Sequence, residues 1–295
     1  MTEPIEKLSK EKISLFWSIL IVVGANIIIA CALFVPFIYS WHVLGALGLL
    51  NSLLIFFVFI GMKRHERVKD KDFSATTFSR KMFNIISGLI FAFFIWLFSP
   101  FLALFILLGI DFAFSFHEIA YVVFKSKTYF TDALNALGRQ SDLFKPYLSS
   151  IMALLGFSIA LGFQTIIFQL YAIKFAPLTY GFVVIIVFIA TILIWALSDT
   201  VAYFVGTYYG KHKLPYNKKK SFEGFFANMA VGIGLGFFFF NPLVLPFISS
   251  FWWIFLSIIG GITSAFFESV DLHLDDNFIT VTFTGIILGT LIILV

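Results

Sequence analysis

The stretch from Ser198 to Gly224 holds the densest set of residues that could do chemistry. It reads S-D-T-V-A-Y-F-V-G-T-Y-Y-G-K-H-K-L-P-Y-N-K-K-K-S-F-E-G and separates two long apolar segments. One carboxylate is followed by two glycines four residues apart, five lysines and a closing Ser-x-Glu-Gly. Several cations and donors near a carboxylate are what a polyphosphate with its metal ion requires. We therefore predict that this stretch binds a polyphosphate at a membrane face.

Three residues at the start of the stretch each have a functional and a structural interpretation. Asp199, placed at the end of an apolar segment, could hold Mg²⁺ against phosphate oxygens, or it could be a solvated acid at a helix end. Gly206 and Gly210 share one helix face and would allow either a ligand or another backbone to approach closely. The pattern G-x-x-x-x-G-K-[ST] is absent, which excludes a P-loop here.

The lysines and the closing motif supply the candidate phosphate contacts. Lys220 is the strongest of them, because it directly precedes a predicted helix start, where anions are favoured. Ser221 and Glu223 fit either phosphate binding or helix capping. Some lysines could serve only to mark topology. The predicted nucleotide-binding set is Gly206, Gly210, Lys211, Lys213, Asn217, Ser221, Glu223 and Gly224.

Two further groups of charged residues lie outside this stretch. Arg80 and Lys81 precede an apolar segment. They are interpreted either as phosphate ligands or as anchors that flank a membrane span. Asp275 and Asp276 stand before the last apolar segment, as metal ligands together with Asp199, or with Asp276 or Asn277 as a helix cap.

Asp111 and Glu268 are acids that the predicted topology leaves unexplained. Asp111 lies either near the middle of its span, where ionisable groups are functional candidates, or at an interface if that span ends early. Glu268 belongs to an acidic connection that has no value as a topology marker, and a second group of metal ligands is one explanation of it.

The composition predicts the elements that hold these residues in place. The chain has 295 residues, of which 60% are hydrophobic and 12% charged, and its mean hydropathy is +1.00. A single cysteine excludes a disulfide framework. We expect an all-α integral membrane protein, one polytopic domain over residues 1–295, with no cleavable signal. Segments of about 20 apolar residues give nine predicted transmembrane helices, at 13–36, 41–62, 82–98, 101–122, 147–170, 178–197, 225–240, 247–266 and 278–295.

Charge placement predicts the orientation of these spans. Every charged residue except Lys174 falls on one side of the nine-span arrangement, and the loop 63–81 is strongly basic. The positive-inside rule makes that side cytoplasmic. The amino terminus and the loops with the candidate site are then predicted to face the cytosol.

Three blocks of the chain resemble one family of membrane enzymes. The loop S-D-x-x-A-Y-x-x-G-x-x-x-G-K-H-K-L-P-Y-N-K-K-K-S-x-E-G, with S-R-K-M-F-N-I-I-S-G at 79–88 and L-D-D-N at 274–277, is similar to the phytol kinase, dolichol kinase and yeast-type diacylglycerol kinase family. That family belongs with the phosphatidate cytidylyltransferases in a wider CTP-using superfamily. The resemblance covers 79–280, and the spans within 13–62 lie outside it.

Two positions depart from the family pattern. Asn84 stands where the family usually has histidine, which puts in doubt any role that needs a titrating imidazole there. The usual Gly-Asp of the central block is Ser198-Asp199.

The resemblance implies a CTP-dependent kinase that phosphorylates a lipid alcohol, of phytol, polyprenol, dolichol or diacylglycerol type, at the cytosolic face. Its partners would be CTP, Mg²⁺ and the bilayer, with no nucleic acid. Asp199, Lys220, Arg80 and Lys81 would carry the catalysis. A cytidylyltransferase that forms a CDP-lipid is the alternative, although its carboxy-terminal signature is absent. A transporter or scramblase is a third possibility, but no inverted repeat is visible.

Overall fold

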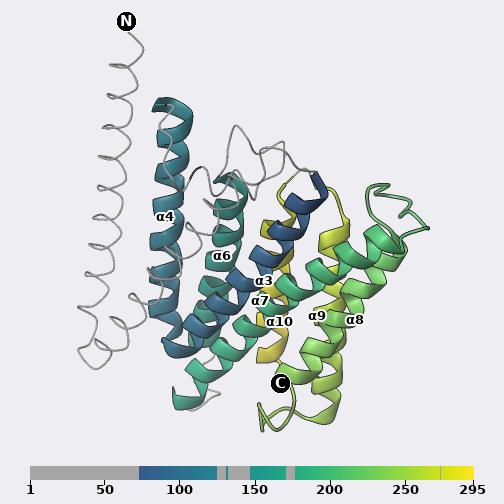
Figure 1. Ribbon diagram of the computed structural model, residues 1–295. Helices are drawn as coiled ribbons and strands as arrows, with labels where there is room; N and C mark the ends of the chain where they lie inside the picture. The colour runs from purple at the N-terminus through teal and green to yellow at the C-terminus, as the bar shows by residue number, and fades with distance from the viewer. Residues whose placement is uncertain (1–72, 125–130, 132–146, 171–176, 273) are drawn as a thin grey trace, which may run out of the picture. The chain divides into compact units, whose positions relative to one another are not determined.

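The computed structural model describes residues 73–124, 131, 147–170, 177–272 and 274–295. The described residues form seven long helices, named α3 (Phe73–Leu97), α4 (Pro100–Phe124), α6 (Leu148–Leu170), α7 (Pro177–Tyr208), α8 (Phe222–Phe239), α9 (Ser250–Ser269) and α10 (Asp276–Ile293) (Figure 1). Each is long and apolar enough to cross a bilayer. The described part of the chain is therefore consistent with the predicted all-α membrane bundle. The count of nine is not confirmed, because the spans predicted at 13–36 and 41–62 lie outside the described residues.

The chain divides into two compact units, and the site lies in the second. The first unit comprises 1–83 and 105–151, and the second comprises 84–104 and 152–295. In the first unit, the Glu118 carboxylate accepts a hydrogen bond from the Tyr147 backbone N–H at 2.9 Å, next to the start of α6. The prediction of a single polytopic domain stays a prediction.

Helix α7 is the centre of the second unit. It packs against α8, α9 and α10, and α9 also packs against α8 and α10. Most of its side chains from Val183 to Ala196 are buried. The loop between α7 and α8 lies at the same end of this unit as the connection between α9 and α10 (Figure 1). Two segments that are far apart in the sequence thus meet there.

The seam between α8 and α9 is built from small residues. A Cβ added at Gly232 would lie 2.7 Å from Gly261 Cα, and one at Gly236 would lie 2.5 Å from Ser257 Cα. Real Cβ contacts are not that short, so the two backbones approach as closely as glycine allows. This packing fixes the register of α8 and α9 below the loop.

One predicted helix boundary was wrong at polar residues. The span predicted at 178–197 ends eleven residues later, at Tyr208, because Ser198, Asp199 and Thr200 are buried within the bundle and continue the helix. The span predicted at 101–122 is continuous through Asp111 to Phe124, which excludes an early end. Asp111 lies near the middle of that helix, with its Oδ1 atom buried and without a hydrogen-bond partner among the described residues.

Candidate functional site

The loop between α7 and α8 is a closed hairpin. Lys213 and Ser221 pair as an isolated antiparallel bridge. The Leu214 N–H donates to the Lys220 carbonyl at 3.1 Å, and the Phe222 N–H donates to the His212 carbonyl at 2.9 Å. These bonds fix the backbone on both sides of Lys220, so its side chain leaves from a defined position.

Ser221 and Glu223 hold the base of the hairpin. Ser221 is the N-cap of α8, and its Oγ accepts a hydrogen bond from the Gly224 N–H at 3.2 Å, which confirms the capping alternative. The Glu223 carboxylate accepts bonds from the backbone N–H groups of Lys211 and His212, each at 3.2 Å, and contacts His212 Nδ1 at 2.7 Å. Both side chains thus have structural roles, and their contact with a nucleotide stays a prediction.

Asn217 fastens the tip of the hairpin to the end of α9. Its Nδ2 donates to the Ser269 carbonyl at 2.9 Å, while its Oδ1 accepts from the Lys219 N–H at 3.1 Å. The neighbouring Tyr216 hydroxyl lies 2.9 Å from Ser269 Oγ. The side chain of Asn217 is buried and engaged on both sides. It therefore positions the loop, and a contact with nucleotide remains a prediction.

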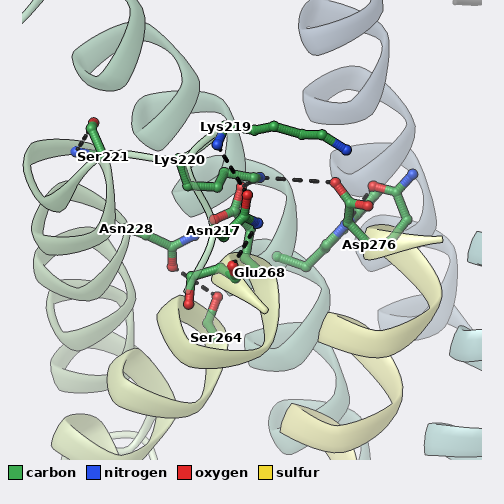
Figure 2. A network of polar contacts seen from close by, with 12 residues as sticks. Asn217, Lys219, Lys220, Ser221, Asn228, Ser264, Glu268 and Asp276 are labelled. Atoms are coloured by element: carbon green, nitrogen blue, oxygen red, sulfur yellow. Dashed lines mark hydrogen bonds and ion pairs between the residues drawn. The ribbon is translucent and has the colours of Figure 1, made fainter. Parts of the chain in front are cut away.

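Lys220 is surrounded by acidic side chains (Figure 2). Its ammonium forms an ion pair with Glu268, near the end of α9, and lies 3.8 Å from Asp276 Oδ2 at the start of α10. The Lys220 side chain is 30% exposed and the Glu268 side chain only 7%. Burial alone would lower the pKa of Lys220. The charges of Glu268, Asp199 and Asp276 outweigh this effect, so the pKa lies above its ordinary 10.5 and the ammonium stays charged.

Asp199 is a buried part of this cluster and not a helix-end decoration. It lies within α7, nine residues before the end of the helix, and is 7% exposed. The interpretation as a solvated helix-end acid is therefore wrong. Its negative charge, like those of Glu268 and Asp276, raises the pKa of Lys220. Three helices, α7, α9 and α10, each contribute one carboxylate around a cation from the loop.

The two acids at the start of α10, Asp275 and Asp276, have different contacts. Asp275 is the N-cap, and its Oδ1 accepts from the Asn277 N–H at 2.9 Å. The cap predicted for Asp276 or Asn277 is thus provided by Asp275 instead. Asn277 Oδ1 accepts from the Trp195 indole N–H at 3.2 Å, which ties α10 to α7. Asp276 is left as the acid of this pair that contacts Lys220.

No group of three or more His, Cys, Asp or Glu side chains converges as a metal site among the residues that the structure describes. The Lys220 ammonium lies in the same group of carboxylates that was predicted to bind the metal ion. Ligation of a metal by Asp199, Asp275 and Asp276 stays a prediction.

The three glycines of the stretch lie where α7 and α8 cross. A Cβ at Gly206 would lie 3.2 Å from Ser221 Oγ, and one at Gly210 2.6 Å from the same atom. A Cβ at Gly224 would lie 2.9 Å from the Ala202 carbonyl oxygen. Close packing of α7 against α8 accounts for Gly206, as one of its two predicted interpretations, and for Gly224. Gly210 lies beyond the end of α7 at Tyr208, so the expected helix face shared with Gly206 is wrong. A backbone contact with a nucleotide stays a prediction.

Four other basic residues were predicted to contact the phosphates. Lys211 and Lys213 are exposed on the hairpin. Arg80 and Lys81 belong to the first unit, inside α3 and not before it, and Lys81 is buried there. Their proposed contact with phosphate stays a prediction.

Glu268 and Asn228 are the residues that sequence reasoning missed. Glu268 was noticed as an unexplained acid, but nothing in its spacing identified Lys220, 48 positions earlier, as its partner. Asn228 is fully buried in α8 and accepts a hydrogen bond from Ser264 of α9 at 3.0 Å. A polar residue within an apolar span was the only available signal for it.

Comparison with known proteins gives one informative similarity. The chain is 37% identical over 112 residues to a probable phytol kinase 3, chloroplastic, from Glycine max. The match covers 36% of this chain and 34% of the relative, so the chain spans about a third of the length of that relative. No family model matches the chain. No solved structure matches it either.

Proposed function

We propose that this multi-pass membrane protein is a kinase that transfers the terminal phosphoryl group of a nucleoside triphosphate to a lipid alcohol. The observation that carries the proposal is the fixed Lys220 ammonium among Glu268, Asp276 and Asp199 at the end of a membrane-spanning bundle. The similarity to a phytol kinase supports the same reaction class. Phosphoryl transfer depends mainly on positioning and charge neutralisation, which such a cluster can provide.

The charge of the cluster argues for a divalent cation as part of the substrate complex. Three carboxylates, those of Glu268, Asp199 and Asp276, act on the one ammonium of Lys220. A bare triphosphate would be repelled, whereas a magnesium complex brings compensating positive charge. Carboxylate oxygens are the ligands that Mg²⁺ prefers. Asp199 and Asp276 are the residues that we expect to hold it, and its chemistry there would be to neutralise phosphate oxygens.

Lys220 is the expected phosphate ligand on the protein side. Its raised pKa keeps the ammonium charged at neutral pH, and the hairpin fixes its backbone. The start of α8, capped by Ser221, adds the positive end of a helix dipole next to it. The ammonium would leave Glu268 for the phosphate oxygens when the nucleotide binds.

The acceptor is proposed to arrive from the bilayer. Seven helices long and apolar enough to span a membrane support a second reactant dissolved in the bilayer, where a long-chain alcohol would present its hydroxyl at the membrane surface. The choice of CTP over other nucleotides rests on the family resemblance alone. Phytol is suggested by the name of the soybean relative, and polyprenols and diacylglycerol remain in the substrate class.

Purified protein in detergent tests the proposal with γ-labelled CTP, ATP, UTP and GTP, Mg²⁺ and a panel of phytol, polyprenol, dolichol and diacylglycerol. We expect labelled lipid in the organic phase with at least one alcohol. The amount of label should be highest when CTP is the nucleotide. Lys220→Met should abolish this label, while Lys218→Met, at an exposed neighbouring lysine, should not. Absence of labelled lipid with every combination would refute the proposed kinase activity.

A further inference from the structure

Asn228 carries a hydrogen-bond donor that the structure leaves unused. The side chain is 0% exposed, and its Oδ1 accepts from Ser264 Oγ at 3.0 Å. Its Nδ2 has no acceptor among the residues that the structure describes. Burying an amide donor without a partner is unfavourable, more so inside a membrane bundle, where water cannot replace the partner. Such a group calls for an explanation in the working cycle of the protein.

The unused donor lies beside the Lys220–Glu268 ion pair. Ser264 and Glu268 are four residues apart in α9 and therefore share one face of that helix. Asn228 meets this face from α8 through its bond to Ser264. Figure 2 shows Asn228, Ser264 and Glu268 grouped directly below Lys220. The amide and the carboxylate thus belong to one polar cluster between two helices.

The backbones that carry the cluster cannot move apart easily or slide. The close contacts at Gly232 and Gly236 lie one and two turns below Asn228 and hold α8 against α9. Asn217 ties the hairpin to the end of α9, just beyond Glu268. A change in the cluster must therefore occur in its side chains.

We propose that Asn228 is a positioning residue that donates to the Glu268 carboxylate when the Lys220 ammonium turns to the triphosphate. The inference rests on the proposed function, since it assumes that a nucleotide draws the ammonium away. At that moment the buried Glu268 carboxylate loses the Lys220 ammonium, and burial favours a donor that replaces this contact. The amide hydrogens of Asn228 are the reserve donor. They keep the Glu268 carboxylate ionised and in place, so that the Lys220 ammonium can leave it at little cost in free energy.

The test is magnesium–nucleotide affinity of the purified full chain, measured by titration calorimetry with a non-hydrolysable CTP analogue in buffers of different ionisation enthalpy. In Asn228→Leu we expect one of two results. Either the affinity for the magnesium–nucleotide falls about tenfold or more, or the protein takes up about one proton on binding because the Glu268 carboxylate is neutralised. Wild type should take up none. In a Glu268→Gln background, Asn228→Leu should have no further effect, because the group it acts through has lost its charge.

Two variants separate this role from packing. Asn228→Asp keeps the size and the bond to Ser264, but its ionised form offers no donor, so affinity should fall with rising pH while wild type stays flat. Ser257→Ala removes a buried hydroxyl of the same seam that donates to the Trp253 carbonyl within α9, and should leave affinity unchanged. Melting in detergent monitors folding throughout.

The outcomes are distinguishable. Suppose that wild type binds the analogue. If folded Asn228→Leu then has the same affinity and takes up the same number of protons, or if folded Asn228→Asp has a flat pH profile, the inference is overturned and the proposed function is not. Equal losses from Asn228→Leu in the wild-type and Glu268→Gln backgrounds also overturn it. Wild type that binds no nucleotide overturns the proposed function, and the inference with it.

Discussion

Replacing Lys220 with methionine separates the structural and the catalytic consequences of the central ion pair. The substitution keeps an unbranched apolar stem but removes the ammonium from beside Glu268, which is 7% exposed. Breaking a buried ion pair by removal of one partner destabilises a protein by about 3–5 kcal/mol. Because the Lys220 side chain is 30% exposed, we expect the lower end, about 3 kcal/mol. That corresponds to roughly a hundredfold change in the folding equilibrium.

Unfolding of the variants in detergent, followed by helical circular dichroism, provides the assay. Lys220→Met should unfold at lower denaturant concentration than wild type. The double variant Lys220→Met with Glu268→Gln should recover most of the lost stability, because the buried Glu268 charge that the ammonium compensates is removed with it. It should not recover turnover, since the phosphate ligand is still missing. Lys218→Met, which removes an exposed charge, is the matched control and should change neither property.

Two results would refute this reasoning. If Lys220→Met unfolds as wild type does, the ion pair with Glu268 contributes no stability. If the double variant turns over at the wild-type rate, Lys220 has no role in phosphate binding.

Three further predictions follow from the same cluster. Asp199→Asn should lower kcat by roughly a hundredfold or more, the expected effect of losing one metal-ligand charge; a folded variant within about threefold of wild type would remove Asp199 from the site. Gly224→Ala should destabilise the protein, because the new Cβ would lie 2.9 Å from the Ala202 carbonyl oxygen, whereas Gly234→Ala in the same helix, where no atom lies within 4 Å, should not; equal melting would contradict close packing of α7 on α8. The raised pKa of Lys220 means that its stabilising contribution is fully present below about 10.4 and is lost only as pH rises through the higher folded value. The stability difference between wild type and Lys220→Met should therefore be constant from about pH 6 to about pH 9, and a difference that shrinks over this range would be inconsistent with it.

The sequence predicted the membrane class and the position of seven helices because apolar runs of spanning length are unambiguous. It failed where polar residues continue a helix. Hydropathy placed the end of the span near Ser198, yet α7 runs on to Tyr208, since Asp199 and Thr200 are sheltered by neighbouring helices. Burial by tertiary neighbours is not a property of the local sequence. The same limit made Asp199 look like a surface acid.

The candidate site was only partly predictable for the same reason. Lys220 lies next to the start of α8, as its local sequence predicts, and its role as a phosphate ligand stays a prediction. Its partner Glu268 was not predictable, since the pairing depends on how α9 packs against α8. Asn217 was predicted to bind nucleotide, and its bonds to Ser269 and Lys219 show a structural role that no motif indicates. Tertiary contacts decide both.

The most direct test of phosphoryl transfer to lipid uses CTP labelled with one isotope at the γ phosphate and another in the base. Purified protein is incubated with this nucleotide, Mg²⁺ and the preferred lipid alcohol, and the ratio of the two isotopes in the lipid product is counted. The account predicts γ label in the lipid with no base label. Base label in the lipid would instead indicate a CDP-lipid-forming cytidylyltransferase, and a lipid fraction that carries neither isotope would contradict the central claim.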